Sequence, residues 1–496
     1  MQLYSKKRGQ YKKKSLKINA VLNGFRSILN LLFPLITFPY VSRILQADGI
    51  GKYNFSNSIV SYFLLIAALG ITNYAVREGA KLRDNREKFS IFASQVFTIN
   101  LFSTLAAYVL LFISLVSFNN LQSYKVAILI FSLQIFFTTI GVEWIYTIYE
   151  EYAYITIRSI AFKLLSVVLL FLFVKRSGDY LNYACITVFA SVGSNILNYL
   201  HSRKFCDIRL TINVDWKKHL KPIVVIFATG IATQIYVNSD VTILGILKDD
   251  YSVGIYSVSS KIYNIVKSLA QALVIVTVPR LSMLLGKSKV EEFNSLLQRV
   301  TGILAMVTIP ATVGLYMLAP QIITIISGEG YLRGVSSLRL LCPALFVSVF
   351  SWIFAYCVLL PAKRESKFFI AAVESAIMNI VLNFILIPFM SENGAALTTS
   401  LAETLMLILI IYYSRDILSG IFLKKFWNDI GTYVLGSIMI GIICVIIKSF
   451  FEMILVQLLL SVVISAVIYF GVLLFFKNQI LVEYIEKIKN KRNYNL

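Results

Sequence analysis

The sequence predicts an all-α, polytopic membrane protein with about 14 transmembrane helices. Of its 496 residues, 58% are hydrophobic, and the mean hydropathy is +0.76. The apolar stretches are each about 18 to 25 residues long, which is the length a helix needs to cross a hydrocarbon core of about 30 Å. The connections between them are too short to fold as a separate catalytic domain.

The expected spans follow one another through short connections. They cover residues 18–41, 53–75, 89–117, 125–148, 156–174, 182–200, 223–247, 254–278, 300–319, 338–360, 368–390, 396–414, 429–447 and 453–476. Lys and Arg gather in the tails and in the connections 76–88, 201–222, 279–299 and 361–367. By the positive-inside rule these segments lie in the cytoplasm, which also places both termini there and requires an even number of spans.

The net charge of +22 does not indicate nucleic-acid binding. The 47 basic and 25 acidic residues lie in short connections and tails, where membrane topology and anionic lipids account for the excess. The five cysteines are scattered without CxxC spacing, so we expect neither a disulfide framework nor a metal site. The basic start of the chain is followed by a long, polar-striped helix without an A-x-A site, which we expect to be retained.

An internal repeat divides the chain. GKYNFSNSI at Gly51 and GIYSVSSKI at Gly254 share Gly, Tyr, Ser and Ile, and their alignment places Ser58 against Lys261. We infer two pseudo-symmetric six-helix lobes, an architecture that many transporters build around a polar site. The expected parts are a basic tail (1–17), an N-lobe (18–200), a basic linker (201–222), a C-lobe (223–414), a final helix pair (415–476) and a second tail (477–496).

Polar stripes at helical spacing mark the helices that line the expected cavity, because a lipid-facing helix would not tolerate them. Four helices carry such stripes, two in each half. The cavity-lining candidates are Asn19, Asn23, Asn30, Asn54, Ser58, Ser61, Thr233, Tyr236, Asp240, Ser257, Asn264 and Gln271.

Three cations lie at membrane depth: Arg26, Lys261 and Lys267. A buried ionised side chain costs roughly 2.5 to 3.5 kcal/mol even on insertion scales, so such residues face a cavity or a partner. A cationic, partly desolvated cavity suits a phosphate-bearing ligand. The alternative is that these cations pair with intramembrane acids such as Asp240 and Glu143, or that Lys267 extends to the interface.

Asp240, Glu374 and Glu403 are the acids that could carry a coupling Na⁺ or proton. For the last two, a hydrogen bond between helices is the alternative role. No other cofactor is expected.

Motifs for enzymatic chemistry are missing. The chain has no GxxxxGK[ST] phosphate loop, no HExxH and no GxSxG. Its only histidines, His201 and His219, lie in or beside the basic linker and are expected to be solvated. The sequence therefore favours a transporter over an enzyme.

The chain resembles the polysaccharide-transporter branch of the multidrug/oligosaccharidyl-lipid/polysaccharide (MOP) exporter superfamily, and within it the Wzx-type flippases. The likeness is carried by FRSILNLLFPLITFPYVSRIL, by LQADGIGKYNFSNSIVSYFLLIAALGITNYAVREGAKLRDN, and by NSDVTILGILKDDYSVGIYSVSSKIYNIVKSLAQALVIVTVPRLS. The segment with LGI, YAVRE and RDN is the most specific.

The resemblance implies two lobes in a V, a further helix pair, and a cavity open alternately to each side of a bacterial inner membrane. The implied substrate is a polyprenyl-diphosphate-linked oligosaccharide repeat unit for capsule, O-antigen or exopolysaccharide. Polymerase and glycosyltransferases of the same pathway would be partners. Arg26 and Lys261 stand where related flippases bind the diphosphate, with lysine here in place of an arginine on the eighth helix.

Competing interpretations remain open at this point. A drug/ion antiporter or a peptidoglycan-precursor flippase of the same superfamily would share the architecture. An integral-membrane polymerase or acyltransferase is less consistent, because this chain lacks a long external loop and a histidine within a span.

Overall fold

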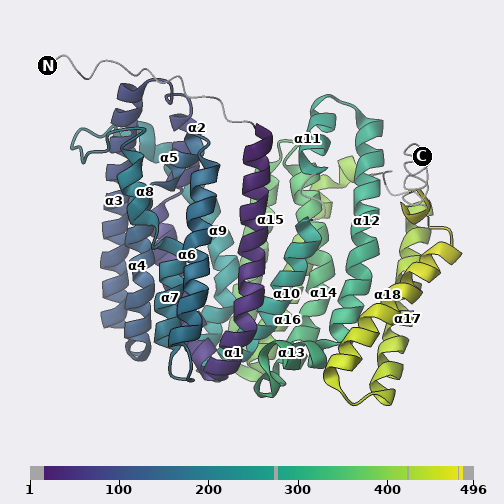
Figure 1. Cartoon of the computed structure of the whole chain (residues 1–496). Helices are drawn as coiled ribbons and strands as arrows, with labels where there is room; N and C mark the ends of the chain where they lie inside the picture. Colours follow the sequence, from purple (N-terminus) through teal and green to yellow (C-terminus); the bar gives the residue numbers. More distant parts are fainter. Residues whose placement is uncertain (1–15, 273–276, 420, 422–423, 479, 484–496) are drawn as a thin grey trace, which may run out of the picture. The chain divides into compact units, whose positions relative to one another are not determined.

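The computed structural model describes residues 16–272, 277–419, 421, 424–478 and 480–483 (Figure 1). Within these ranges the side chains of residues 16–23, 25–32, 229, 232, 233, 424 and 425 are not described. The described chain is helical, without a strand. Eleven of its helices are long and apolar enough to cross a membrane. The expected fold class, an all-α multi-pass membrane protein, is confirmed.

The chain divides into two compact units. The first comprises Met1–Thr37, Phe63–Phe173 and Asn182–Phe227, and the second comprises Phe38–Tyr62, Val174–Leu181 and Ala228–Leu496. Two long helices pass from one unit to the other: α1 (Leu16–Ala68) and α9 (Trp216–Leu247). α1 has a non-helical residue, Gln46, at φ 58° and ψ 180°, so two helices meet there at a kink.

The first unit also contains the shorter helices of the N-terminal half. They are α2 (Ile71–Gly79), α3 (Arg86–Ser117), η1 (Asn119–Tyr124), α4 (Lys125–Gly141), α5 (Glu143–Ile148), α6 (Tyr152–Phe173), α7 (Tyr180–Val192) and α8 (Asn195–Ser202). Its core is rich in aromatic residues, with Phe89, Trp144, Tyr146 and Phe205 packed among aliphatic side chains. These side chains come from α3, α5 and the segment after α8, so they fix that segment to the bundle.

The second unit contains the remaining helices. They are α10 (Asp250–Ala272), α11 (Val278–Gly286), α12 (Val290–Met317), α13 (Ala319–Ser327), η3 (Glu329–Tyr331), α14 (Gly334–Phe354), the π-turn η4 (Ala355–Leu359), α15 (Glu365–Met390), α16 (Glu392–Leu418), α17 (Lys424–Phe450) and α18 (Ile454–Phe475).

In the described part of the chain the fourteen expected spans lie mostly on helix, with several differences in detail. The second span is interrupted before Ile71, where α2 begins, and the sixth before Asn195, where α8 begins. The fourth span is broken at Val142, whose φ of 37° ends α4 and starts α5. The connection after the first span is itself helical, because α1 continues through its kink. Short helices α11 and α13 occupy connections expected to be loops. α9 and α10, the expected seventh and eighth spans, are not among the eleven candidate membrane spans found in the described residues.

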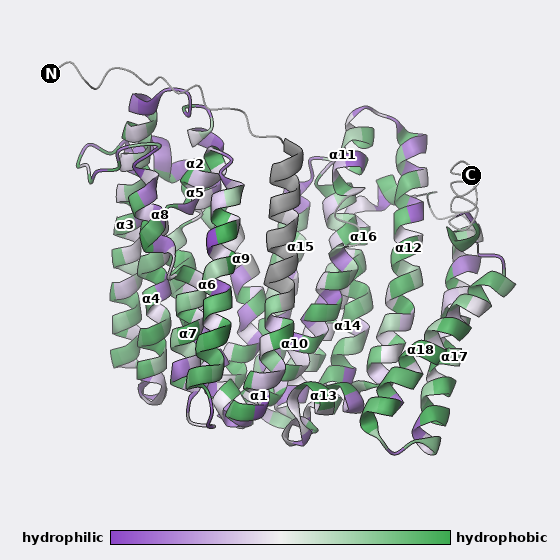
Figure 2. Ribbon diagram, in the orientation of Figure 1, coloured by the Kyte–Doolittle hydropathy of each residue, from purple (hydrophilic) through white to green (hydrophobic). Residues whose placement is uncertain are grey.

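Hydrophobic residues predominate along the long helices, which are mostly green in Figure 2, and many of their large apolar side chains are exposed. On α3, the exposed residues Phe102, Leu105, Val109, Phe112 and Val116 are spaced three, four, three and four apart. This spacing places them on one helical face, where only a hydrocarbon environment makes their exposure favourable. α3 therefore presents a lipid-facing stripe.

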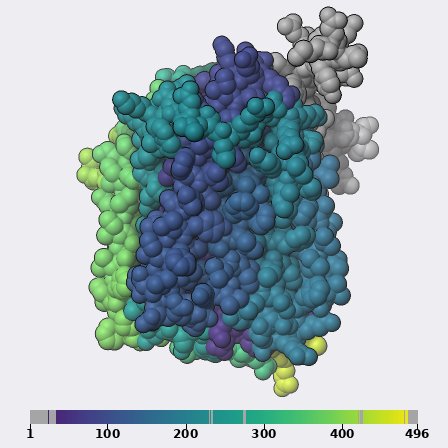
Figure 3. All heavy atoms as spheres, turned by 90° about the vertical axis from the view of Figure 1, so that its left-hand side faces the viewer, coloured from purple at the N-terminus to yellow at the C-terminus, as the bar shows by residue number. Residues whose placement is uncertain are grey.

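The basic connection after α8 runs extended along α3. Backbone N–H groups of Asp207 and Arg209 donate to the hydroxyls of Ser90 and Ser94 at 3.1 and 3.0 Å, and Thr211 N–H donates to the next hydroxyl in the row, Thr98, at 3.2 Å. Two residues of an extended chain advance about 6.6 Å, and four residues of a helix advance about 6 Å. Every second amide of the connection therefore meets every fourth residue of α3. Figure 3 shows this connection in teal over one end of α3, which is blue.

The expectation that the histidines are solvated is wrong for His219. Its side chain is 0% exposed, with Tyr74 Oη 2.6 Å from Nδ1 and Gln95 Oε1 2.8 Å from Nε2. Gln95 Nε2 donates to Asn213 O, so its oxygen faces the ring and accepts the Nε2 proton while Tyr74 donates to Nδ1. This neutral tautomer uses both ring nitrogens. Burial, and then nearby Lys218, lower the pKa of His219 below its usual 6.5.

Candidate functional site

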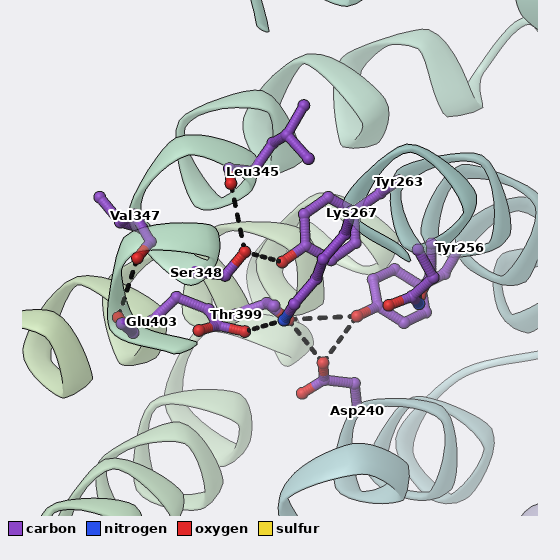
Figure 4. Close-up of polar contacts among 12 residues, drawn as sticks. Asp240, Tyr256, Tyr263, Lys267, Leu345, Val347, Ser348, Thr399 and Glu403 are labelled. Atoms are coloured by element: carbon purple, nitrogen blue, oxygen red, sulfur yellow. Dashed lines mark hydrogen bonds and ion pairs between the residues drawn. The ribbon is translucent and has the colours of Figure 1, made fainter. Parts of the chain in front are cut away.

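Asp240 of α9 lies at the centre of a buried polar network in the second unit (Figure 4). Its Oδ2 accepts hydrogen bonds from the hydroxyls of Tyr256 and Thr399, both at 2.6 Å. Its Oδ1 accepts from Asn383 Nδ2 at 2.6 Å. Among the described residues no Lys or Arg lies within ion-pair distance of this carboxylate. Neutral donors alone therefore surround a carboxyl group that is 5% exposed.

Tyr256 belongs to α10, whereas Asn383 and Thr399 come from α15 and α16, two helices that are joined by a sharp turn. Ser391, at φ 48°, separates α15 from α16. A Cβ on Gly394 would lie 2.8 Å from the Leu386 carbonyl, so glycine permits the two helices to approach closely. This approach brings Asn383 of α15 to Thr398 of α16, whose hydroxyl donates to its amide oxygen at 2.5 Å.

A second buried group, an ion pair, joins α10 to α16. Lys267 Nζ lies 2.7 Å from Glu403 Oε1, and the two side chains are 20% and 7% exposed. The ammonium group also lies 5.5 Å from the centre of the Tyr263 ring, whose hydroxyl contacts Ser348 Oγ at 3.2 Å. Figure 4 shows this ion pair beside the Asp240 network.

The ion pair borders a cavity of about 180 Å³ inside the second unit. The cavity lies among α9, α10, α14, the π-turn, α15 and α16. Its lining residues are Tyr236, Lys267, Gln271, Ser348, Ser351, Trp352, Tyr356, Phe368, Ala372, Ser375, Glu403 and Met406. Of the residues expected to line a cavity or to bind substrate or ions, Tyr236, Lys267, Gln271 and Glu403 are thus brought to one site.

Lys261 lies apart from this cavity. Six residues separate it from Lys267, and at about 100° per residue the two side chains leave α10 about 120° apart. Lys261 is half-buried, and no carboxylate in the described part of the chain pairs with it. Ser257, one turn earlier on the same helix, has a buried hydroxyl for which the described residues supply no partner. Asn264 is exposed and donates to Ser260.

The remaining expected residues are dispersed. Asn54 and Ser61 bond to carbonyls of their own helix, Ser58 accepts a hydrogen bond from Thr242 of α9, and Glu374 is exposed on α15. The alternative that Asp240 pairs with Lys261 is not realised, because the described partners of Asp240 are neutral. The side chains of five expected residues lie outside the described part of the structure: Asn19, Asn23, Arg26, Asn30 and Thr233.

The sequence analysis missed several members of both sites. Asn383 donates to Asn379, and the two lie four residues apart in an expected span, which is the same signal that marked the first helix. Trp352, Tyr356 and Ser375 gave no comparable signal, because aromatic residues and serines are common within spans.

The side chains at these sites do not form a cluster typical of transition-metal binding. In the described ranges, no group of three or more His, Cys, Asp and Glu could hold a metal ion. The buried carboxyl of Asp240 is instead a group that can take a proton or bind a hard cation, since such ions prefer oxygen ligands.

Comparison with known proteins identifies the family. The model of a family described as polysaccharide biosynthesis protein matches residues 18–285, more than half of the chain. The chain belongs to this family. An Escherichia coli (strain K12) protein provisionally named O-antigen transporter is 24% identical to this family member over 411 residues, covering 82% of the chain and 98% of the relative. Staphylococcus aureus capsular polysaccharide biosynthesis protein CapF is 22% identical over 405 residues, which cover 79% of this chain and 97% of the relative.

Solved structures share the fold of this polysaccharide biosynthesis protein. The lipid II flippase MurJ in an inward closed conformation superposes with a TM-score of 0.75 at 17% identity, covering 94% of this chain and all of the other. An inward-facing multidrug MATE transporter of the MOP superfamily gives a TM-score of 0.58 at 15% identity, covering 82% and 99%. The expected MOP-type fold is confirmed.

Proposed function

We propose that this protein is a flippase that moves a polyprenyl-diphosphate-linked oligosaccharide repeat unit from the inner to the outer leaflet of a bacterial plasma membrane. It works by alternating access, with both termini in the cytoplasm, and it supplies capsule, O-antigen or exopolysaccharide assembly. The polymerase and glycosyltransferases of that pathway act before and after it, and the chain itself catalyses no covalent step. Family membership supports the polysaccharide pathway.

The unpartnered ammonium group of Lys261 is the observation that supports this function most directly. A half-buried lysine at membrane depth with no carboxylate among the described residues has a free-energy cost that an anionic ligand would offset. A lipid diphosphate supplies such an anion. We also assign Arg26 to diphosphate binding, on the basis of its position in the sequence alone. We assign Lys267 elsewhere, because its bond to Glu403 leaves it a weaker phosphate ligand.

The experiment replaces each cation in a strain that depends on this protein for its surface polymer. Arg26→Ala and Lys261→Ala should each lower surface polymer at least tenfold, with lipid-linked repeat units accumulating inside and protein levels unchanged by immunoblot. Lys261→Arg should retain export, because guanidinium also binds phosphate. Lys125→Ala, at an exposed lysine that starts α4, is the matched control. Normal export in both alanine variants would contradict the proposal.

The same strain distinguishes the proposed oligosaccharide flippase from the two alternatives, a peptidoglycan-precursor flippase and a drug/ion antiporter. A peptidoglycan-precursor flippase would use the same diphosphate chemistry, but its loss would stop cell-wall synthesis rather than polymer export. A drug/ion antiporter would leave both processes intact and alter drug resistance.

Asp240 is our candidate for ion coupling, by a proton or Na⁺. Burial without a described cationic partner makes the ionised carboxylate costly, and a proton or a bound cation would remove that cost, which the three donated hydrogen bonds offset only in part. Glu403, in contrast, already pairs with Lys267, and Glu374 is exposed.

The coupling test uses proteoliposomes with an imposed Na⁺ or pH gradient. Asp240→Asn, which keeps the size of the side chain, should abolish the acceleration of substrate flipping by the gradient. Glu374→Gln is the matched carboxyl-to-amide control on α15 and should leave it intact. Gradient-driven flipping that survives in Asp240→Asn and disappears in Glu374→Gln would transfer the role to Glu374.

A further inference from the structure

The cavity beside Lys267 has an aromatic wall. The rings of Trp352 and Tyr356 stack with centroids 4.9 Å apart and planes at 27°, and Phe368 meets Tyr356 edge-on at 6.0 Å. Tyr356 belongs to the π-turn Ala355–Leu359, which alters the direction of side chains at the end of α14. Single π-turns inside helices recur at functional sites. The π-turn here places the Tyr356 ring, which is 38% exposed, in the lining of the cavity.

Two residues that line the cavity have buried hydroxyls. Ser375 is 0% exposed, and its hydroxyl has no hydrogen-bond partner among the described residues. The hydroxyl of Tyr236 on the facing helix α9 is also buried without a geometrically sound hydrogen bond, and it interacts electrostatically with Glu403. Buried hydroxyl groups without partners are unfavourable. Both residues line the cavity, so a polar ligand there would give their hydroxyl groups hydrogen-bond partners.

The charge and size of the cavity restrict that ligand. Lys267 and Glu403 neutralise each other at 2.7 Å, so the lining offers both donors and acceptors without a net charge that would favour phosphate. The volume of about 180 Å³ is well above the roughly 10 to 15 Å³ that a single water molecule needs on this measure. The cavity therefore has room for a ligand larger than water, such as one sugar ring.

We propose that this cavity is a subsite for one neutral sugar residue of the transported oligosaccharide. The apolar face of the sugar ring stacks on Trp352 and Tyr356, as amphipathic rings do on aromatic side chains. Its hydroxyls, each both donor and acceptor, bond to Ser375, Tyr236 and the Lys267–Glu403 pair. The inference rests on the proposed function, since it assigns to the substrate a contact separate from that of the diphosphate.

The test measures binding of methyl glycosides of glucose, galactose and N-acetylglucosamine to the full-length protein in nanodiscs, by tryptophan fluorescence. At least one glycoside should bind with a millimolar Kd. Tyr236→Phe and Ser375→Ala should each weaken it at least tenfold. Their thermal unfolding midpoints should be unchanged or raised without ligand, because each variant removes a buried hydroxyl that makes no geometrically sound hydrogen bond in the described structure. A merely structural role of these hydroxyls would not affect glycoside binding.

Ser461→Ala is the matched control. Ser461 on α18 is also 0% exposed and has an unpartnered hydroxyl in the described structure, but it does not line the cavity. Its loss should leave the Kd unchanged. Absence of binding by all three glycosides would overturn the subsite, as would equal binding in Ser375→Ala, Tyr236→Phe and the control. Tighter binding of tetraphenylphosphonium that Trp352→Ala removes would overturn it in favour of a drug site.

The outcomes for the subsite and for the flippase are separable. The export assay with Lys261→Ala decides the flippase proposal without reference to glycosides. Normal polymer export together with absent glycoside binding would overturn the subsite alone.

Discussion

Gly51 and Gly254 each pack against the backbone of the other's helix. A Cβ on Gly51 would lie 1.8 Å from the carbonyl oxygen of Asp250, and a Cβ on Gly254 would lie 1.9 Å from that of Ala47. Asp250 precedes Gly254 by four residues, and Ala47 precedes Gly51 by four. Exchanging the two repeats therefore exchanges the two contacts, as a local two-fold axis requires. This reciprocity supports the internal duplication inferred from GKYNFSNSI and GIYSVSSKI.

A methyl group at either glycine should be strongly destabilising. In Gly51→Ala and Gly254→Ala the added carbon would overlap a backbone oxygen, which cannot rotate away, so the helices must separate. Overpacking of this kind costs about 1 to 3 kcal/mol or more. We expect a lower thermal unfolding midpoint in detergent for each variant.

The control for this prediction is Gly441→Ala on α17, where a Cβ would meet nothing within 4 Å. There the change should be neutral or stabilising, because alanine has the higher helix propensity by about 1 kcal/mol. Equal unfolding midpoints for all three variants would show that the helices carrying Gly51 and Gly254 have room for a methyl group, and would contradict the close contact.

The Lys267–Glu403 pair should behave as a unit. Lys267→Met leaves a buried carboxylate without its cation, which should cost about 3 to 5 kcal/mol of stability. The double variant Lys267→Met/Glu403→Leu removes both charges and should recover most of that loss. Unfolding midpoints of the single and double variants measure the coupling, and additive effects of the two changes would argue against a direct pair.

His219 should make stability depend on pH. Its pKa in the folded protein is lowered, chiefly by burial, while the unfolded value is about 6.5. Its stabilising effect is therefore fully present above pH 6.5. It declines as the pH falls toward the folded pKa, because only the unfolded chain then takes up the proton, by at most about 1.4 kcal/mol per pH unit.

The measurement compares wild type with His219→Gln between pH 7.5 and pH 5. The wild type should have the higher thermal unfolding midpoint at pH 7.5, and its difference from His219→Gln should become smaller at pH 5. A constant difference across this range would mean that His219 titrates alike in both states.

The fold was predictable to a large extent because membrane spans are specified by length and hydropathy, which are local properties of the sequence. The break at Val142 was not predicted, because the apolar stretch continues past it and Gly141 is the only local signal beside it. At the site, Asp240 and Glu403 stood out as charges in apolar spans. The partner of Glu403 could not be chosen in advance, because spacing along α10 does not show which of its two lysines faces α16.

His219 illustrates the same limit. Its neighbours in the sequence are basic and polar, which predicts a solvated loop. Its partners Tyr74 and Gln95 are far away in the chain, and only the folded connection brings them together.

The segment that lies along α3 is held through its main chain, at every second residue, by a row of hydroxyl groups. Its side chains contribute nothing to those three bonds, so substitutions other than proline at Asp207, Arg209 and Thr211 would leave the bonds in place. Removing a single residue would instead put every later amide out of phase with the row. These three bonds therefore constrain the length of this segment rather than the identity of the side chains at Asp207, Arg209 and Thr211.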